Sequence, residues 1–183
     1  NFLLKWGNSG DGDGEFYDPC GITVDILSGN VYVVDGGNDR IQKFDSSGNF
    51  LFKWGEVGEA DGQFWYPSSI VSDSFGNVYV TDVGNARIQK FDSNGNFLLK
   101  WGTEVYGYGE FNRPIGISID SSNNIYVVDE DNSCIVKFDV NGNFLQEWGR
   151  DQTADGQFDS PEGIATDSSG NIYVTDQDNN RIQ

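Results

Sequence analysis

The chain has 183 residues, of which 24 are glycine and 14% are aromatic, a mixture typical of many short strands joined by tight turns. Its 11 basic and 29 acidic residues give a formal net charge of −18, which opposes binding to nucleic-acid backbones and to anionic membranes. No stretch is long and apolar enough to predict a membrane span.

The beginning of the chain shows no recognisable signal peptide, and the sequence contains no methionine. We therefore expect a processed product or a piece of a longer protein. From the first residue onward one motif, Asn-Phe-Leu-x-x-Trp-Gly, recurs at a spacing of 47 or 48 residues. We expect one domain over residues 1–183, made of the repeats 1–48, 49–95, 96–142 and 143–183.

Each repeat contains the same elements in the same order. A loop of the form Gly-x-Phe-x-x-Pro ends at Pro19, Pro67, Pro114 and Pro161. A first short strand follows around Ile22, Ile70, Ile117 and Ile164. The second strand is apolar on both faces and covers 31–35, 78–82, 125–129 and 172–176. Apolar residues on both faces are expected of a strand placed between two neighbouring sheets.

The third and fourth strands complete the repeat. The third begins at Arg40, Arg87, Cys134 and Arg181, and the fourth ends at Trp6, Trp54, Trp101 and Trp148. Turns such as 45–49 and 92–96 (Asp-Ser-x-Gly-Asn) join them as hairpins. Four short strands per 40 to 50 residues predict an all-β fold, with β-propeller blades of four antiparallel strands.

The blade pattern resembles the NHL repeat. It reads Gly-x-Phe-x-x-Pro-x-Gly-Ile, then Gly-Asn-Val-Tyr-Val-x-Asp-x-x-Asn-x-Arg-Ile-Gln-Lys-Phe-Asp-x-x-Gly-Asn-Phe, and it departs from itself at Ser69 and Cys134. The resemblance implies blades of a closed propeller, most often six-bladed. It also implies binding of proteins or RNA, a lyase activity in one branch, and an extracellular location for many prokaryotic members.

The order of the predicted strands is offset relative to the blades. The chain begins with a fourth strand before Trp6 and ends inside a third strand at 181–183, so these two segments are expected to be able to pair. Three arrangements follow: a piece cut from a longer propeller, a small ring of four blades that closes on itself, or closure with another copy of the chain by strand exchange.

Four carboxylates end the predicted second strands and are weak candidates for a divalent-cation site such as calcium. They are Asp35, Asp82, Asp129 and Asp176. The alternative, that they cap turns and pair with the third-strand arginines, is favoured because a residue repeated in every blade usually builds the blade. The acidic segment 11–15 lacks the spacing of a calcium loop. We expect no cofactor.

The best candidates for binding are the residues by which the repeats differ, on loops held by rigid blades. They are Tyr17, Trp65, Tyr66, Tyr106, Tyr108 and Arg113. For Tyr17 and Trp65, packing between adjacent blades is an equally supported alternative.

These patterns favour a non-catalytic interaction scaffold that binds a protein or a glycan, at the cell surface or outside the cell. Most basic residues occupy repeated positions and form no basic stripe, so no nucleic-acid binding is expected. Without histidine, Ser-His-Asp or Cys-His machinery and the metal ligands of the lyase branch are missing. The alternatives are a protein that assembles by strand exchange, and an ion-dependent or lyase-like enzyme that needs residues outside this chain. Cys20 and Cys134 are expected to be buried free thiols.

Overall fold

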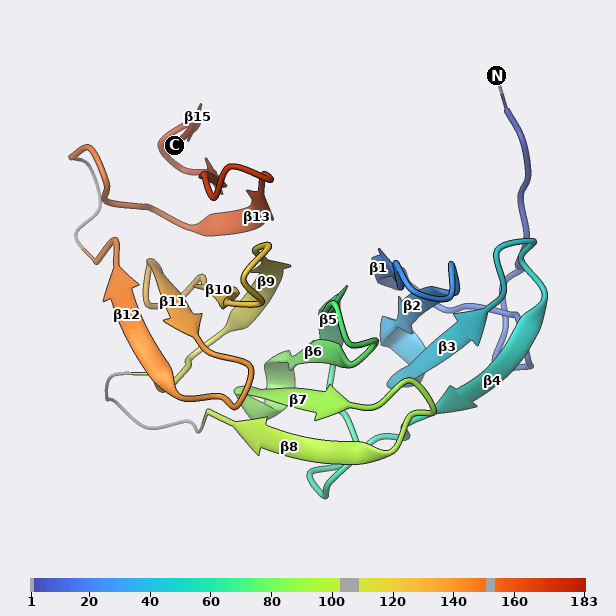
Figure 1. The fold of residues 1–183 in the computed structure, drawn as a ribbon. Helices are drawn as coiled ribbons and strands as arrows, with labels where there is room; N and C mark the ends of the chain where they lie inside the picture. The colour runs from blue at the N-terminus through green and yellow to red at the C-terminus, as the bar shows by residue number, and fades with distance from the viewer. Residues whose placement is uncertain (1, 103–108, 151–153) are drawn as a thin grey trace.

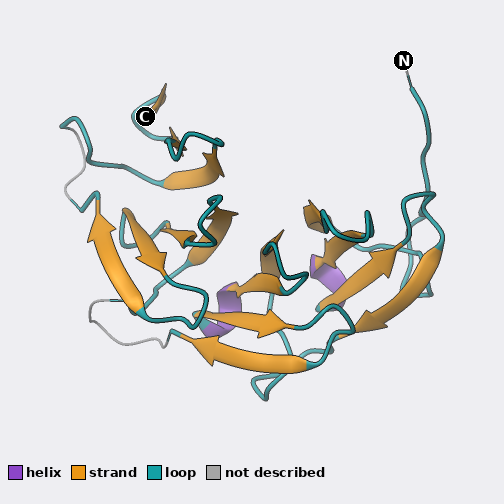
Figure 2. Cartoon of the chain, viewed as in Figure 1, coloured by secondary structure: helices purple, strands orange, loops and turns teal. Residues whose placement is uncertain are grey.

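The protein is built almost entirely of β-strands. The computed structural model describes residues 2–102, 109–150 and 154–183, and this part of the chain contains fifteen strands and two short 3-10 turns. Figure 2 shows how little of the described chain is helical. The all-β class predicted from the sequence is confirmed.

The strands fall into four sets according to their depth in the molecule. The innermost are β1 (Pro19–Val24), β5 (Pro67–Ser72), β9 (Pro114–Ile119) and β13 (Pro161–Thr166). The second are β2 (Val31–Asp35), β6 (Val78–Asp82), β10 (Ile125–Asp129) and β14 (Ile172–Asp176). The third are β3 (Arg40–Phe44), β7 (Arg87–Phe91), β11 (Cys134–Phe138) and β15 (Arg181–Ile182). The outer strands are β4 (Phe50–Trp54), β8 (Phe97–Trp101) and β12 (Phe144–Trp148). The 3-10 turns are η1 (Gly36–Asn38) and η2 (Val83–Asn85).

Consecutive strands pair antiparallel to form four separate sheets, which we call blades 1 to 4. Blades 1 to 3 have four strands each, and the described part of blade 4 has three, in the order β13-β14-β15. The inner strands β1, β5, β9 and β13 contact one another in turn around the middle of the molecule. Figure 1 shows that the four blades form an open arc, with blade 4 and the N-terminal segment facing each other across the opening.

The expected strand before Trp6 does not form in this structure. Residues 2–7 have no strand structure, and Phe2 and Leu3 are exposed. The physical reason is the position of its expected partner: the edge strand β15 lies at the other end of the open arc. A strand needs a neighbour to satisfy its backbone N–H and C=O groups, and this segment has none.

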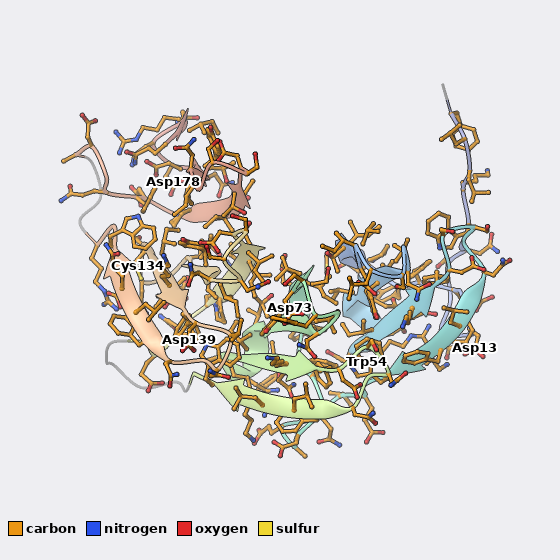
Figure 3. All side chains as sticks on the ribbon, in the orientation of Figure 1. Asp13, Trp54, Asp73, Cys134, Asp139 and Asp178 are labelled. Carbon is orange, nitrogen blue, oxygen red and sulfur yellow. The ribbon has the colours of Figure 1, made fainter. Side chains whose placement is uncertain are left out.

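The core lies between neighbouring blades. Tyr32 and Val34 of blade 1 pack against Ile70 and Val80 of blade 2, and the same contact recurs between the next blades. Figure 3 shows side chains filling these spaces, with Trp54 between the first two blades. Trp54 meets Tyr32 edge-on at 6.0 Å between ring centroids. The second strands β2, β6 and β10 are buried along their whole length, as expected. The expectation is wrong for β14, where Tyr173 and Thr175 are exposed because no further described blade covers that end of the arc.

The repeated glycine after each Trp makes room for a buried phenylalanine. Gly55 has φ 97°, and a Cβ at this position would lie 2.6 Å from the ring of Phe64, which is fully buried. Gly102 has the same relation to Phe111. The Trp-Gly and Gly-x-Phe motifs are therefore two halves of one packing contact, which ties the loop before each inner strand to the end of the preceding outer strand.

The two cysteines are both free, as expected, but they differ in exposure. Cys134 is buried, whereas Cys20 is exposed, so the expectation of two buried thiols is wrong for Cys20. Cys20 lies on the inner strand of blade 1 and lines the open middle of the arc, where its Sγ donates to the carbonyl of Pro67 at 3.4 Å. Among the described residues, no helix has the length and apolarity needed to cross a membrane.

Candidate binding site

The four repeated carboxylates are buried and engaged within their own blades. Asp82 accepts hydrogen bonds from Arg87 Nε at 2.6 Å, from Asn85 Nδ2 and Gln89 Nε2, and from the backbone N–H of Trp65. Asp35 and Asp176 have equivalent partners, with Arg40 Nε at 2.7 Å and Arg181 Nε at 2.6 Å. These carboxylates hold the loop before the inner strand against the turn after the second strand.

The arginine completes this arrangement with its outer nitrogens. Arg87 Nη1 donates to the carbonyl of Glu59, and Nη2 donates to the carbonyls of Ala60 and Gln63. One side chain therefore closes the loop that precedes the inner strand. Burial is the main cause that raises the pKa of Asp82, and the hydrogen bonds and Arg87 oppose it.

Blade 3 replaces this arginine with Cys134 and organises its carboxylate differently. Asp129 accepts hydrogen bonds from the backbone N–H groups of Asn112 and Arg113 and from Asn132 Nδ2. Burial raises the pKa of Asp129 as well. Arg150 of the next loop pairs with Glu147 and also interacts electrostatically with Asp129.

The four carboxylates do not converge on one point. Each is used by its own blade, and no group of three or more Cys, Asp or Glu side chains suitable for a metal ion occurs among residues 2–102, 109–150 and 154–183. The possible calcium site at Asp35, Asp82, Asp129 and Asp176 has no geometric support in this structure, whereas the pairing of Asp35, Asp82 and Asp176 with arginine is observed.

Four of the candidate binding residues, Tyr17, Trp65, Tyr66 and Arg113, lie on one face of the arc, which we call the loop face. It consists of the residues just before each inner strand, the turns after each second strand, and the first two residues of β13, namely 17–18, 36–39, 65–66, 83–86, 112–113, 130–133, 159–162 and 177–180. Backbone hydrogen bonds clamp these segments together, including Gly37 N to Tyr17 O at 2.9 Å and Gly84 N to Trp65 O at 2.7 Å. The loops of this face are therefore rigid extensions of the blades.

Tyr17 and Trp65 do not pack between blades but lie on glycines of their own blades. A Cβ on Gly37 would be 2.1 Å from Tyr17 Cδ1, and a Cβ on Gly84 would be 2.7 Å from Trp65 Cγ. Tyr17 remains 62% exposed and Trp65 46% exposed. Each ring thus has one side on a glycine turn and substantial surface open to solvent, so neither ring is enclosed between two described blades.

Tyr66 extends this aromatic surface. Its ring stacks on Trp65 with centroids 6.4 Å apart and an interplanar angle of 30°, and the side chain is 65% exposed. Its backbone has φ 50°, a left-handed conformation that is costly for a residue with a Cβ. Asp39 of blade 1 accepts a hydrogen bond from Tyr66 N at 2.8 Å, which stabilises this conformation. Asp18 and Ser160, at the equivalent positions of blades 1 and 4, have the same conformation, with φ 51° and 47°, so this backbone geometry belongs to the repeat and Tyr66 differs from them in its exposed ring.

Arg113 lies beside Tyr66 at the inner end of the loop face. Both line a cavity of about 380 Å³, together with Asp18, Gly36 and Ser68. A neighbouring cavity of about 470 Å³ shares Cys20, Ser68, Arg113 and Ile115 with it and adds Glu130 and Glu162. Arg113 Nη1 contacts Glu130 Oε2. The structure thus brings Tyr66 and Arg113 together, with Trp65 stacked behind Tyr66.

Two of the predicted binding residues cannot be placed. Tyr106 and Tyr108 lie outside the described residues. Sequence reasoning also missed residues of the loop face, including Asp39, Glu130 and Glu162. A signal was present for two further missed residues, Asp131 and Asp178, which stand in blades 3 and 4 at the positions that Gly37 and Gly84 occupy under the aromatic rings of blades 1 and 2. Comparison of these turn positions across repeats would have revealed the pairing of ring and glycine.

Comparison with known proteins supports the repeat assignment. The model of the NHL repeat matches at residues 64–91, 111–138 and 158–183, each time from the buried Phe of the loop into the third strand. The resemblance seen in the sequence is confirmed. No match was found among curated protein sequences.

Solved structures share the fold at low sequence identity. A streptogramin B lyase is 20% identical with a TM-score of 0.68, covering 90% of this chain and 50% of its own. Virginiamycin B lyase from Staphylococcus aureus is 16% identical with a TM-score of 0.68, covering 88% and 50%. A chain of a nidogen/laminin complex is 22% identical with a TM-score of 0.65, covering 91% and 59%. The chain spans about half the length of these structures, and the likeness concerns the fold alone.

Proposed function

Because the chain carries NHL repeats folded as propeller blades, we propose that it is a non-catalytic scaffold that binds a protein partner through its loop face. The observation that carries this proposal is the exposed aromatic group of Tyr17, Trp65 and Tyr66, held rigidly on the ends of blades 1 and 2. Large aromatic side chains are the usual anchors of interfaces because they bury much area at little cost in conformational entropy. A neighbour of the same fold occurs in a nidogen/laminin complex.

The repeated carboxylates are poorly placed for catalysis because they are buried and bonded within their own blades. Acid–base catalysis needs a carboxylate that can reach a substrate, and Asp35, Asp82 and Asp176 are instead buried and bonded to arginine and amide groups. A lyase-like reaction would need residues outside this chain, since the sequence has no histidine.

Arrays of random peptides and of glycans, probed with the purified chain, test this function. We expect peptide ligands that lose binding in a Trp65→Ala/Tyr66→Ala variant. The matched control is Phe75→Ala, which removes an exposed aromatic from the β5–β6 turn at the opposite end of blade 2. Peptide binding that is equal in all three proteins, or binding to glycans alone, would contradict the proposal.

A second candidate function, assembly between copies, is favoured by the exposed faces at the two ends of the arc. On blade 1 the inner-strand residue Ile22 is 62% exposed, whereas its equivalent Ile70 is 2% exposed because blade 1 covers it. On blade 4, Tyr173 and Ile182 are exposed, although their equivalents in blade 2 are buried. Apolar side chains exposed on the end blades but buried between the inner ones favour contact of these faces with another surface.

Light scattering after size exclusion tests assembly on residues 1–183. A defined dimer or larger oligomer that dissociates in an Ile22→Glu variant would support closure between copies. A monomer at all concentrations would overturn it. Leu51→Glu, on the outer strand β4, is the control because Leu51 is exposed but lies away from both open faces.

A further inference from the structure

The loop face has its exposed aromatic residues on blades 1 and 2 and most of its carboxylates on blades 3 and 4. Where Gly37 and Gly84 support aromatic rings, blades 3 and 4 place Asp131 and Asp178, both exposed. The loop face as a whole contains seven carboxylate residues and one basic residue, Arg113. The seven are Asp18, Asp39, Glu130, Asp131, Asp159, Glu162 and Asp178.

The single arginine of this face does not balance the carboxylates around it. Arg113 contacts Glu130, and the neighbouring Asp131 and Glu162 add negative charge. The pKa of Glu130 is raised, first by burial, and the like charges of Asp131 and Glu162 add to the rise despite Arg113. The inner part of the loop face therefore has an excess of negative charge beside the exposed ring of Tyr66.

We propose that the partner segment bound at the loop face is basic, with lysine or arginine side chains that lie over Tyr66 and Trp65 and enter the cavities lined by Asp18, Glu130 and Glu162. This inference rests on the proposed function and names the chemistry of its partner. A cation is attracted both by the face of an aromatic ring and by carboxylates, and here the two lie on one surface.

The net charge of the whole molecule also favours a basic partner. A net charge of −18 steers cationic partners toward the protein and repels acidic ones. Cation–π contacts also occur within the chain: Lys43 Nζ lies 5.0 Å from the ring centroid of Tyr32, and Lys90 Nζ lies 5.1 Å from that of Tyr79. Trp65 and Tyr66 offer comparable rings on the surface.

Isothermal titration calorimetry with defined probes in moderate salt tests the inference. The probes are Arg-Gly-Arg-Gly-Arg, its Glu and Gln counterparts of equal length, and chitotetraose as an uncharged glycan. We expect the basic peptide to bind and the acidic and neutral peptides to bind at least about tenfold more weakly, which corresponds to about 1.4 kcal/mol.

Variants separate this site from general attraction to an acidic protein. Trp65→Ala/Tyr66→Ala is expected to lower the affinity for the basic peptide about tenfold, and Glu162→Gln is expected to lower it about threefold. Glu59→Gln is the matched control, because it removes the same charge from an exposed position in the outer loop of blade 2, outside both cavities. It is expected to change the affinity less than Glu162→Gln. Melting curves establish that each variant is folded, and Glu162→Gln tests the inference alone if the aromatic variant unfolds.

Three results would overturn the inference. Equal affinity of the basic peptide for wild type, Glu162→Gln and Glu59→Gln would indicate attraction to net charge only. Binding of the neutral or acidic peptide that depends on Trp65 and Tyr66 would leave the proposed function intact but reject a basic partner. Binding of chitotetraose in place of the peptides would reject both the basic segment and the protein partner.

Discussion

Single residues of this protein have roles that depend on burial. The ion pair of Arg87 and Asp82 is almost completely buried, with side chains 6% and 0% exposed, whereas Lys100 and Asp61 form a pair at the surface. A buried carboxylate depends on its hydrogen-bond and ion-pair partners, because its desolvation is expensive. In blades 1, 2 and 4 the repeated Asp, Asn, Arg and Gln therefore act as a unit that positions the loop, whereas blade 3 has Cys134 and Val136 in place of the Arg and the Gln.

Removal of the arginine from this unit is expected to be strongly destabilising. Arg87→Met leaves Asp82 buried without its cation, and we expect a loss of about 3–5 kcal/mol in the free energy of unfolding. Urea unfolding measures this loss. The double variant Asp82→Asn/Arg87→Met is expected to recover part of it, because no uncompensated charge remains. Equal losses in the two variants would show that the charge of Asp82 is not the cause.

The glycine under Trp65 provides a second prediction at this scale. In Gly84→Ala the new methyl group would meet Trp65 Cγ at 2.7 Å and the Trp65 carbonyl at 2.8 Å, so the ring and the loop must move. We expect a loss of about 1–3 kcal/mol from overpacking, together with a blue or red shift of tryptophan emission. Gly163→Ala, where the nearest atom is Thr175 Oγ1 at 3.2 Å, is the milder control. Unchanged stability and emission in Gly84→Ala would contradict the described seat of Trp65.

At the scale of elements, lysines of the third strands connect one blade to the next. Lys43 Nζ donates to the carbonyl of Ser93 at 2.7 Å, and Lys90 Nζ donates to that of Val140 at 3.0 Å. Each carbonyl lies in the following blade, in the turn between its third strand and its outer strand. Burial lowers the pKa of both lysines. The lysines of blades 1 and 2 thus connect each of these blades to the following one.

Loss of one of these inter-blade hydrogen bonds is expected to lower the free energy of unfolding more than loss of a surface ion pair does. Lys90→Met removes a hydrogen bond from a charged donor, worth about 1.5–3 kcal/mol. Lys100→Met, the matched control, breaks the exposed pair with Asp61 and is expected to cost less than about 1 kcal/mol. Chemical denaturation of both variants measures the difference. Equal costs would show that the inter-blade bond adds nothing beyond the surface charge.

The hairpin turns predict a dependence of stability on pH. In the β3–β4 turn, Asn49 Nδ2 and then Asn49 N donate to Asp45, and these bonds lower the pKa of the Asp45 carboxyl. Its stabilising contribution is present above the ordinary pKa of Asp, about 4, and is lost as the pH falls through the lowered value, because the unfolded chain takes up the proton first.

NMR titration of the side-chain carboxyl carbons tests this prediction. We expect the pKa of Asp45 to rise toward its ordinary value in Asn49→Ala. The melting temperature of this variant is then expected to fall less on acidification than that of the wild type. Asn96→Ala, in the equivalent turn of blade 2, is expected to leave the pKa of Asp45 unchanged and to raise that of Asp92, whose carboxyl it bonds. No change at Asp45 in Asn49→Ala would reject the assigned cause.

At the scale of the whole molecule, the negative charge opposes the compact state. Like charges repel one another more in the folded arc than in the unfolded chain, and dissolved salt screens that repulsion. We expect the melting temperature to rise with sodium chloride. Calcium and magnesium chloride are expected to have equal effects at equal ionic strength. A rise specific to calcium would reveal a cation site that the described carboxylates do not form.

The sequence by itself determined the local architecture of this protein. The repeated Trp-Gly, Gly-x-Phe and Asp-x-x-Asn patterns predicted four blades, the order of their strands and the burial of the second strands in blades 1 to 3. These features depend on contacts between neighbouring elements and between adjacent repeats, and such contacts follow from strand periodicity and turn chemistry. Of the candidate site, the sequence indicated Tyr17, Trp65, Tyr66 and Arg113 through their deviation from the repeat.

Only the tertiary structure decided which of these deviating residues are exposed and how the arc ends. Trp65 lies on Gly84 and not between blades because the turn after β6 leaves room for a ring, which no periodicity reveals. The segment before Trp6 has the sequence of an outer strand but forms none, because a strand needs a partner in space and β15 lies across the opening of the arc. Pairing between distant ends depends on the summed angles between blades, a property of the whole molecule.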